Sequence, residues 1–171
     1  MEKAFKLVYI IDRMNQKEKP LGKKMLQKII YLLQRNGVDL GYDYIIHHYG
    51  PYSSKLGNDV YSLAIDDYIG IDLSFLPIHK ISVNEDIFEE EYKEIFGTEK
   101  AKVDKLIDKF SLFSTQDLEL LTTIDFVKNS NDSAIKNDND LFNIVKGIKG
   151  ETFSDEKIFE GLKTIETLFE H

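Results

Sequence analysis

The sequence has no cysteine, and this absence excludes several kinds of chemistry. Disulfide bonds, thiolate nucleophiles and metal sites with cysteine ligands are impossible without it. The chain has 171 residues, of which 42% are hydrophobic and 30% are charged, so its composition is that of a globular protein that folds without covalent links. Because cysteine-free chains suit reducing compartments, we expect a cytoplasmic protein.

The sequence also lacks a long hydrophobic run. The apolar run at residues 7–11 is too short to cross a bilayer. Lys6 and Asp12 flank it with charge, and no small-residue cleavage site follows. We therefore expect neither a signal peptide nor contact with a membrane.

Motifs of familiar enzyme classes are missing too. There is no glycine-rich phosphate loop, nucleophile elbow or zinc-protease motif. His47 and His48 are the candidates for a metal ligand or a general base, but adjacent strand residues point to opposite faces. Residues 138–140 resemble the start of a calcium loop, yet Phe142 stands where an oxygen ligand is needed. The sequence therefore predicts no catalytic residue, cofactor or metal, unless a site without a motif forms around a histidine.

Negative charge is in excess but unevenly distributed. The chain has 22 Lys and Arg against 30 Asp and Glu, a net charge of -8, which argues against general affinity for nucleic acid. Residues 1–36 contain nine basic and three acidic residues, a local balance of +6, whereas residues 37–100 have -9 and residues 101–171 have -5. This polarity leaves one small basic surface for a partner, either an acidic protein or DNA.

Hydrophobic spacing predicts two helices at the start of the chain. Apolar residues repeat with helical spacing over residues 4–11 and again over residues 26–33. Gly37 ends the second helix because glycine adopts a left-handed conformation at little steric cost. The run at residues 7–11 is also compatible with a short buried strand.

The next segment mixes strands with one helix. Residues 42–49 are aromatic and β-branched, which indicates a strand that ends at residues 50–51. Residues 56–64 carry a third helical stripe, and the alternation over residues 69–84 predicts a β-hairpin with a bent connection. Two helices, a strand, a helix and a hairpin indicate a winged-helix-like module over residues 1–84.

The second half, residues 85–171, is predicted to be helical. Apolar stripes with helical spacing cover residues 88–96, 103–110, 120–127, 141–148 and 158–169. Ser114 and Asp117 form the pattern of a capping box, and Ser154 caps the last helix. The fold class is therefore mostly α (α+β), with a winged-helix-like N-terminal module and a C-terminal helical bundle packed on it as one unit.

The segment Tyr49-Gly50-Pro51-Tyr52-Ser53 is the most distinctive stretch. Glycine and proline force a sharp exit from the strand, and Ser53 is placed to cap the following helix. One interpretation is a purely structural corner. The other is a partner contact, since rigid tyrosines suit interfaces.

Basic residues precede and follow this segment. Lys24 and Lys28 share a helix face, which is either a solvated face or a contact for phosphates or an acidic partner. Lys55 lies on the helix in the place of a recognition helix, but Asp59 and the acidic pair at residues 66–67 oppose an approach to DNA. The candidate partner-binding residues are Lys23, Lys24, Lys28, Tyr49, Pro51, Tyr52, Ser53 and Lys55.

Two motifs together resemble a known family. Residues 26–32 (Leu-Gln-Lys-Ile-Ile-Tyr-Leu), followed by residues 49–53 and Leu56, look like the YwgA family of bacterial proteins. Residues 120–124 and 149–156 extend this similarity to the helical end. The N-terminal part more distantly resembles the Panacea and SocA-type antitoxin domain, although isoleucine replaces leucine at positions 29 and 30. Those antitoxins neutralise toxins or adapt them to proteases by protein contact, and no catalytic residue is carried over.

Three hypotheses follow for function. The leading one is a non-enzymatic interaction protein of antitoxin or prophage-regulator type, whose protein partner is a toxin or a regulator. The alternative is a winged-helix DNA-binding transcriptional regulator, based on the order of elements and the basic first segment. The third is an enzyme with a site around His47 or His48.

Overall fold

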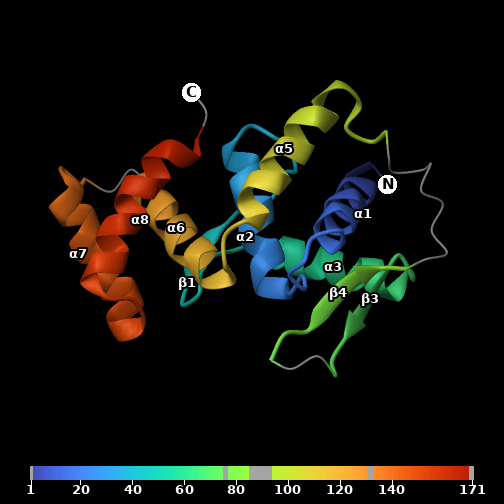
Figure 1. Ribbon diagram of the computed structural model, residues 1–171, viewed down its shortest axis with the longest axis horizontal. Helices are drawn as coiled ribbons and strands as arrows, with labels where there is room; N and C mark the ends of the chain where they lie inside the picture. Colours follow the sequence, from blue (N-terminus) through green and yellow to red (C-terminus); the bar gives the residue numbers. More distant parts are fainter. Residues whose placement is uncertain (1, 75–76, 85–93, 131–132, 170–171) are drawn as a thin grey trace.

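The computed structural model describes residues 2–74, 77–84, 94–130 and 133–169, and most of these are helical (Figure 1). The α-helices are α1 (Glu2–Asn15), α2 (Lys23–Arg35), α3 (Ser54–Ile65), α5 (Lys100–Ser111), α6 (Thr115–Lys128), α7 (Asp138–Lys149) and α8 (Asp155–Leu168). Strands β1 (Ile45–His47) and β2 (Gly50–Tyr52) form one antiparallel hairpin, and β3 (Ile69–Asp72) and β4 (Lys80–Val83) form another. The predicted class, mostly α with a few strands, is confirmed.

Helix α2 is the centre of the molecule. Every residue from Met25 to Leu33 is buried, because α5, α6 and strand β2 surround the helix. From the sequence, the face with Lys24 and Lys28 was either a solvated face or a contact for phosphates or an acidic partner. A solvated face is wrong for Lys28, because neighbouring elements enclose its side chain, and they enclose Gln27 as well.

Helix α6 is the second central element and packs against α2, α7, α8 and strand β2. Its buried residues run without a break from Leu118 to Asp125, so it has no polar face over most of its length. The buried polar residues include two acids, Glu119 and Asp125. These acids face the basic side chains of α2.

Opposite charges join α2 to α6. Asp125 Oδ2 accepts hydrogen bonds from Arg35 Nε and from the Tyr31 hydroxyl, each at 2.6 Å. One turn or more away, Glu119 Oε2 accepts from Lys24 Nζ at 3.2 Å. The basic first segment and the acidic remainder of the sequence therefore meet inside the fold.

The helix boundaries follow local chemistry. Ser114 and Asp117 form the predicted capping box at the start of α6, and Ser154 Oγ accepts from the backbone N–H of Lys157 at the start of α8. Gly37 has a φ of 82°, as expected for the glycine that ends α2. These parts of the prediction are confirmed because each depends on residues that are close in sequence.

The predicted strand before residue 50 needs correction, and one predicted helix is largely not described by the structure. The strand expected over residues 42–49 is limited to β1, and the segment at residues 50–52, expected to end it, pairs with it as β2. Tyr42 is instead held by Gln34, whose side-chain amide exchanges two hydrogen bonds with the Tyr42 backbone. The helix expected over residues 88–96 falls largely outside the described residues.

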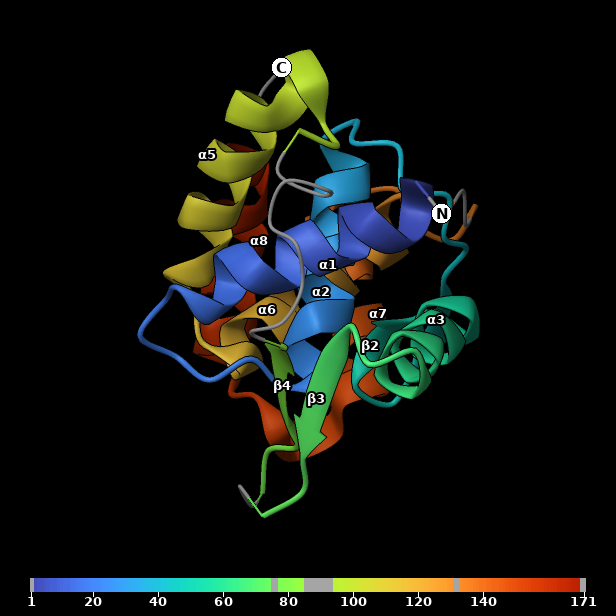
Figure 2. The ribbon, with the colours of Figure 1, turned by 90° about the vertical axis from the view of Figure 1, so that its right-hand side faces the viewer.

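The two halves share one hydrophobic core. Helices α7 and α8 lie at the opposite end of the molecule from the β3–β4 hairpin, with α2 and α6 between them (Figure 1). Figure 2 shows that hairpin next to α3 and α1, which contact β3 and β4 respectively. Buried apolar side chains from both sides of residue 84 belong to the same cluster. None of the helices in the described part of the chain is long and apolar enough to span a membrane.

Candidate functional site

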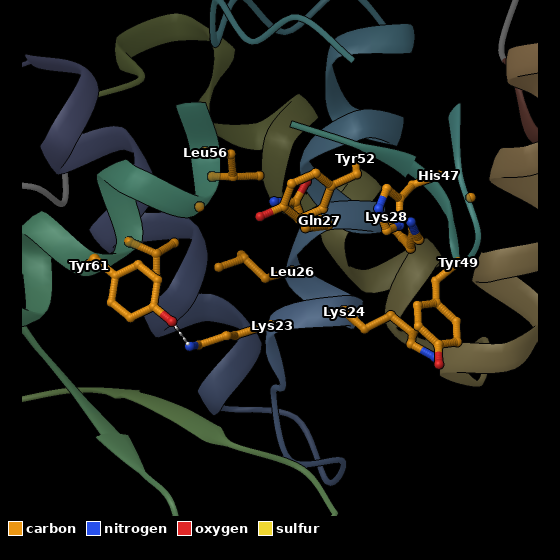
Figure 3. Close-up of a pocket in the computed structure, with 13 residues that line it drawn as sticks. Lys23, Lys24, Leu26, Gln27, Lys28, His47, Tyr49, Tyr52, Leu56 and Tyr61 are labelled. Carbon is orange, nitrogen blue, oxygen red and sulfur yellow. Dashed lines mark hydrogen bonds between the residues drawn. The ribbon is translucent and has the colours of Figure 1, made fainter. Parts of the chain in front are cut away.

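A pocket of about 450 Å³ opens between α2, α3 and the β1–β2 hairpin (Figure 3). Its apolar part is formed by Leu26, Leu56 and Val60. Lys23 and Tyr61 lie at one end, where Lys23 Nζ donates to the tyrosine hydroxyl at 2.7 Å. The pocket is therefore apolar inside and cationic at its edge.

The other end of the pocket carries a lysine on a tyrosine ring. Lys24 Nζ lies 3.8 Å from the centre of the Tyr49 ring, in a cation–π contact. His47 and Tyr52 complete this side, with ring centroids 5.7 Å apart. None of the described residues that line the pocket is acidic, although the chain as a whole has a net charge of -8.

The inner wall joins the two sequence motifs of the first half. The Gln27 side chain donates to the Ser53 carbonyl at 2.9 Å and accepts from the Ser53 N–H at 3.0 Å. The Ser53 hydroxyl in turn accepts from the Leu56 N–H and caps α3. Gln27 therefore fixes the direction in which the chain enters α3.

Lys28 holds the same corner one residue further along. Its Nζ donates to the Pro51 carbonyl at 2.6 Å, and the side chain is buried. Gly50 has a φ of 85°, and a Cβ at this position would lie 2.8 Å from Thr123 Oγ1 on α6. Only glycine allows the hairpin backbone to approach α6 so closely.

A third lysine reaches this region from α7. Lys149 Nζ donates to Glu119 Oε1 at 2.8 Å and to the His48 carbonyl at 3.1 Å. Lys24 and Lys149 thus share the carboxylate of Glu119, whereas Lys28 has no carboxylate partner among the described residues. The cluster has three lysines and one glutamate.

This imbalance perturbs the protonation of the cluster. Burial lowers the pKa of Lys28 to about 7, and the positive charge of Lys149 adds to the effect. Burial also lowers the pKa of Lys149, although its hydrogen bond to Glu119 opposes the change. For Glu119, burial raises the pKa, but the hydrogen bonds from Lys149 and Lys24 outweigh burial and leave the pKa below its ordinary value.

The structure brings seven of the eight candidate residues together and separates their roles. Lys23, Lys24, Tyr49 and Tyr52 line the pocket and are partly or largely exposed. Lys28, Pro51 and Ser53 are buried, so they hold the corner and do not form part of an exposed contact surface, contrary to the expectation.

Lys55 and His48 lie outside this pocket. Lys55 is exposed on α3 and borders a separate depression with Lys3 and Asp59. His48 packs edge-on against Tyr49, and only its neighbour His47 lines the pocket. No group of three potential metal ligands lies close together in the ranges that the structure describes.

Sequence reasoning missed the exposed apolar residues of the β1–β2 hairpin and of α3, of which Tyr61 lines the pocket. Ile45 is 63% exposed and Tyr61 is 55% exposed, and Ile46 is also exposed. Ile45 and Ile46 belong to the strand predicted over residues 42–49. Exposed isoleucines on a three-residue strand leave no separate signal in the sequence, because their pattern is that of a buried strand.

The basic surface expected from the first segment is partly neutralised by acids of the second half. Lys17 and Arg13 pair with Asp108 on α5. Lys19 Nζ donates to three backbone carbonyls at the end of α5, those of Ser111, Leu112 and Phe113. Part of the basic charge of the first segment therefore makes contacts between the two halves of the molecule.

Comparisons with known proteins add no assignment. The chain matches no protein-family model, and no curated protein matches it.

Proposed function

We propose that the protein is a non-enzymatic, cytoplasmic interaction protein that binds a protein partner at the pocket between α2, α3 and the β1–β2 hairpin. The observation that carries this proposal is the combination of an apolar pocket with the exposed Tyr49, Tyr52 and Tyr61 that line it. Exposed aromatic residues beside a preformed pocket are typical of protein interfaces. The resemblance to antitoxins agrees with this role and implies a toxin or a regulator as the partner.

The charges at the edge of the pocket define the partner further. Lys23 and Lys24 lie at its two ends, and no acidic side chain lines it among the described residues. A segment that inserts one apolar or aromatic side chain and carries aspartate or glutamate beside it is complementary to this surface. We therefore infer that the partner presents an acidic segment with one apolar anchor.

Co-purification from the native host tests this proposal. The wild-type protein, Tyr52→Ala, Lys23→Glu and the control Leu112→Ala are each used as bait, and retained proteins are quantified by mass spectrometry. Leu112 is 78% exposed and does not line the pocket, so its truncation removes apolar surface elsewhere. We expect one protein to be retained by the wild type and the control and lost from both pocket variants. An identical set from all four baits contradicts the proposal.

DNA binding is the second candidate and has less support. The lysines of the first segment are mostly paired with carboxylates, and α3 and the turn after it carry Asp59, Asp66 and Asp67. A DNA pull-down over a range of salt concentrations decides between the two. Binding that survives competitor DNA and weakens steeply with salt supports the DNA-binding regulator.

A further inference from the structure

Lys28 is a buried lysine that borders the pocket and has no ion-pair partner among the residues that the structure describes. Its side chain is 2% exposed, and its Nζ donates to a neutral backbone carbonyl, that of Pro51. Gly50 also lines the pocket, and a Cβ there would lie 3.4 Å from Nζ. Lys28 and Gly50 therefore meet at the inner wall of the apolar pocket, where the hairpin backbone packs closely on α6.

The surroundings of Lys28 favour its neutral form. Lys24 from its own helix, Lys149 from α7 and Glu119 from α6 face it, and His47 lines the same pocket from the hairpin. One carboxylate balances one of the three ammonium groups, and burying the uncompensated charge is costly. With a pKa of about 7, about half of the Lys28 side chains are neutral amines at neutral pH.

We propose that Lys28 is a nucleophilic amine that condenses reversibly with an aldehyde bound in the pocket. A lysine that is desolvated in an apolar pocket beside another cationic group is an established form of activated nucleophile. The ligand class follows from the lining: an aromatic or apolar body lies against Leu26 and Leu56, and an anionic group pairs with Lys23 or Lys24. This inference goes beyond the proposed partner binding and does not depend on it.

The condensation needs no oxidant or reductant. The Nζ lone pair attacks the carbonyl carbon, the C=O π pair moves to oxygen, and a proton passes from nitrogen to that oxygen to give a carbinolamine. Loss of the hydroxyl group with a further nitrogen proton releases one water and leaves a C=N bond. The products are one imine and one water for each amine and aldehyde consumed.

Reductive labelling followed by peptide mapping tests the proposal. The folded protein is incubated with 4-carboxybenzaldehyde and sodium cyanoborohydride at pH 7.4, and the modified fraction of each lysine is read by mass spectrometry. At this pH a lysine with its pKa near 7 is about 70% neutral, whereas an ordinary lysine is about 0.1% neutral. We expect Lys28 to be labelled at least about tenfold more than the exposed Lys55 or the equally buried, ion-paired Lys149. Labelling that follows exposure, with Lys28 at or below Lys55, overturns the proposal.

A further measurement tests recognition of the anionic group. Benzaldehyde, which lacks the carboxylate, should label Lys28 at least about threefold less than 4-carboxybenzaldehyde does. Equal labelling by the two aldehydes overturns the assignment of Lys23 and Lys24 to an anionic group. The principal measurement uses the wild-type chain, so it does not depend on whether a Lys28→Met variant folds.

Discussion

Replacement of Lys28 by methionine should remove a pH dependence from the stability of the protein. Lys28 keeps its proton in the unfolded chain until about pH 10.5, but burial and the neighbouring lysines lower its pKa in the folded protein to about 7. Between these values the unfolded state binds one more proton than the folded state. The free energy of unfolding therefore rises with pH in this window, and the stabilisation is lost as the pH falls towards 7.

The size of this effect follows from the two pKa values. Each pH unit inside the window is worth about 1.4 kcal/mol, and the slope begins gradually near pH 7. From pH 7 to pH 9 the free energy of unfolding of the wild type should gain about 2 kcal/mol from Lys28. Lys28→Met has no titrating group at this position, so the difference between the two proteins should change by this amount.

Urea unfolding followed by circular dichroism at pH 7, 8 and 9 measures the difference. Lys55→Met is the control, because Lys55 is exposed on α3 and lies outside the pocket. We expect the control to follow the wild type within about 0.5 kcal/mol at each pH. A difference between the wild type and Lys28→Met that stays constant from pH 7 to pH 9 would refute deprotonation of Lys28 in this range.

Two other substitutions test the packing around the corner and the junction between the halves. Gly50→Ala should lower the free energy of unfolding by about 2–4 kcal/mol in urea titrations. The reason is that the alanine would combine a left-handed backbone with a Cβ 2.8 Å from Thr123 Oγ1. A loss below about 1 kcal/mol would contradict the close approach of β2 to α6. Tyr31→Phe removes a hydrogen bond to buried Asp125 and should cost about 1–3 kcal/mol. Tyr61→Phe, at a tyrosine that is 55% exposed, is its control and should cost less than about 0.5 kcal/mol.

The β1–β2 hairpin shows where prediction from sequence stopped. Aromatic and β-branched residues over 42–49 indicated one strand, but the chain uses Gly50 and Pro51 as a second strand that pairs back on residues 45–47. The pairing is set by contacts of the corner with Gln27 and Lys28, which lie more than 20 residues earlier in the chain. Propensity describes single residues and their neighbours and carries no information about such contacts.

The sequence by itself determined the local features of this protein. Helical spacing of apolar residues placed the helices, and the Ser114–Asp117 capping box and Gly37 marked boundaries that the structure confirms. These features depend on residues within one or two turns of each other, so the order of amino acids is sufficient to define them.

Only the tertiary structure decided what the charges do. Lys24 meets Glu119 across 95 residues of sequence, and Lys28, four residues along the same helix, is enclosed with no carboxylate partner in the described part of the chain. In the sequence the two lysines are equivalent members of one basic face. Their burial and pKa values differ because those properties depend on which distant elements pack beside each side chain, and that is fixed only when α2, α6, α7 and the hairpin come together.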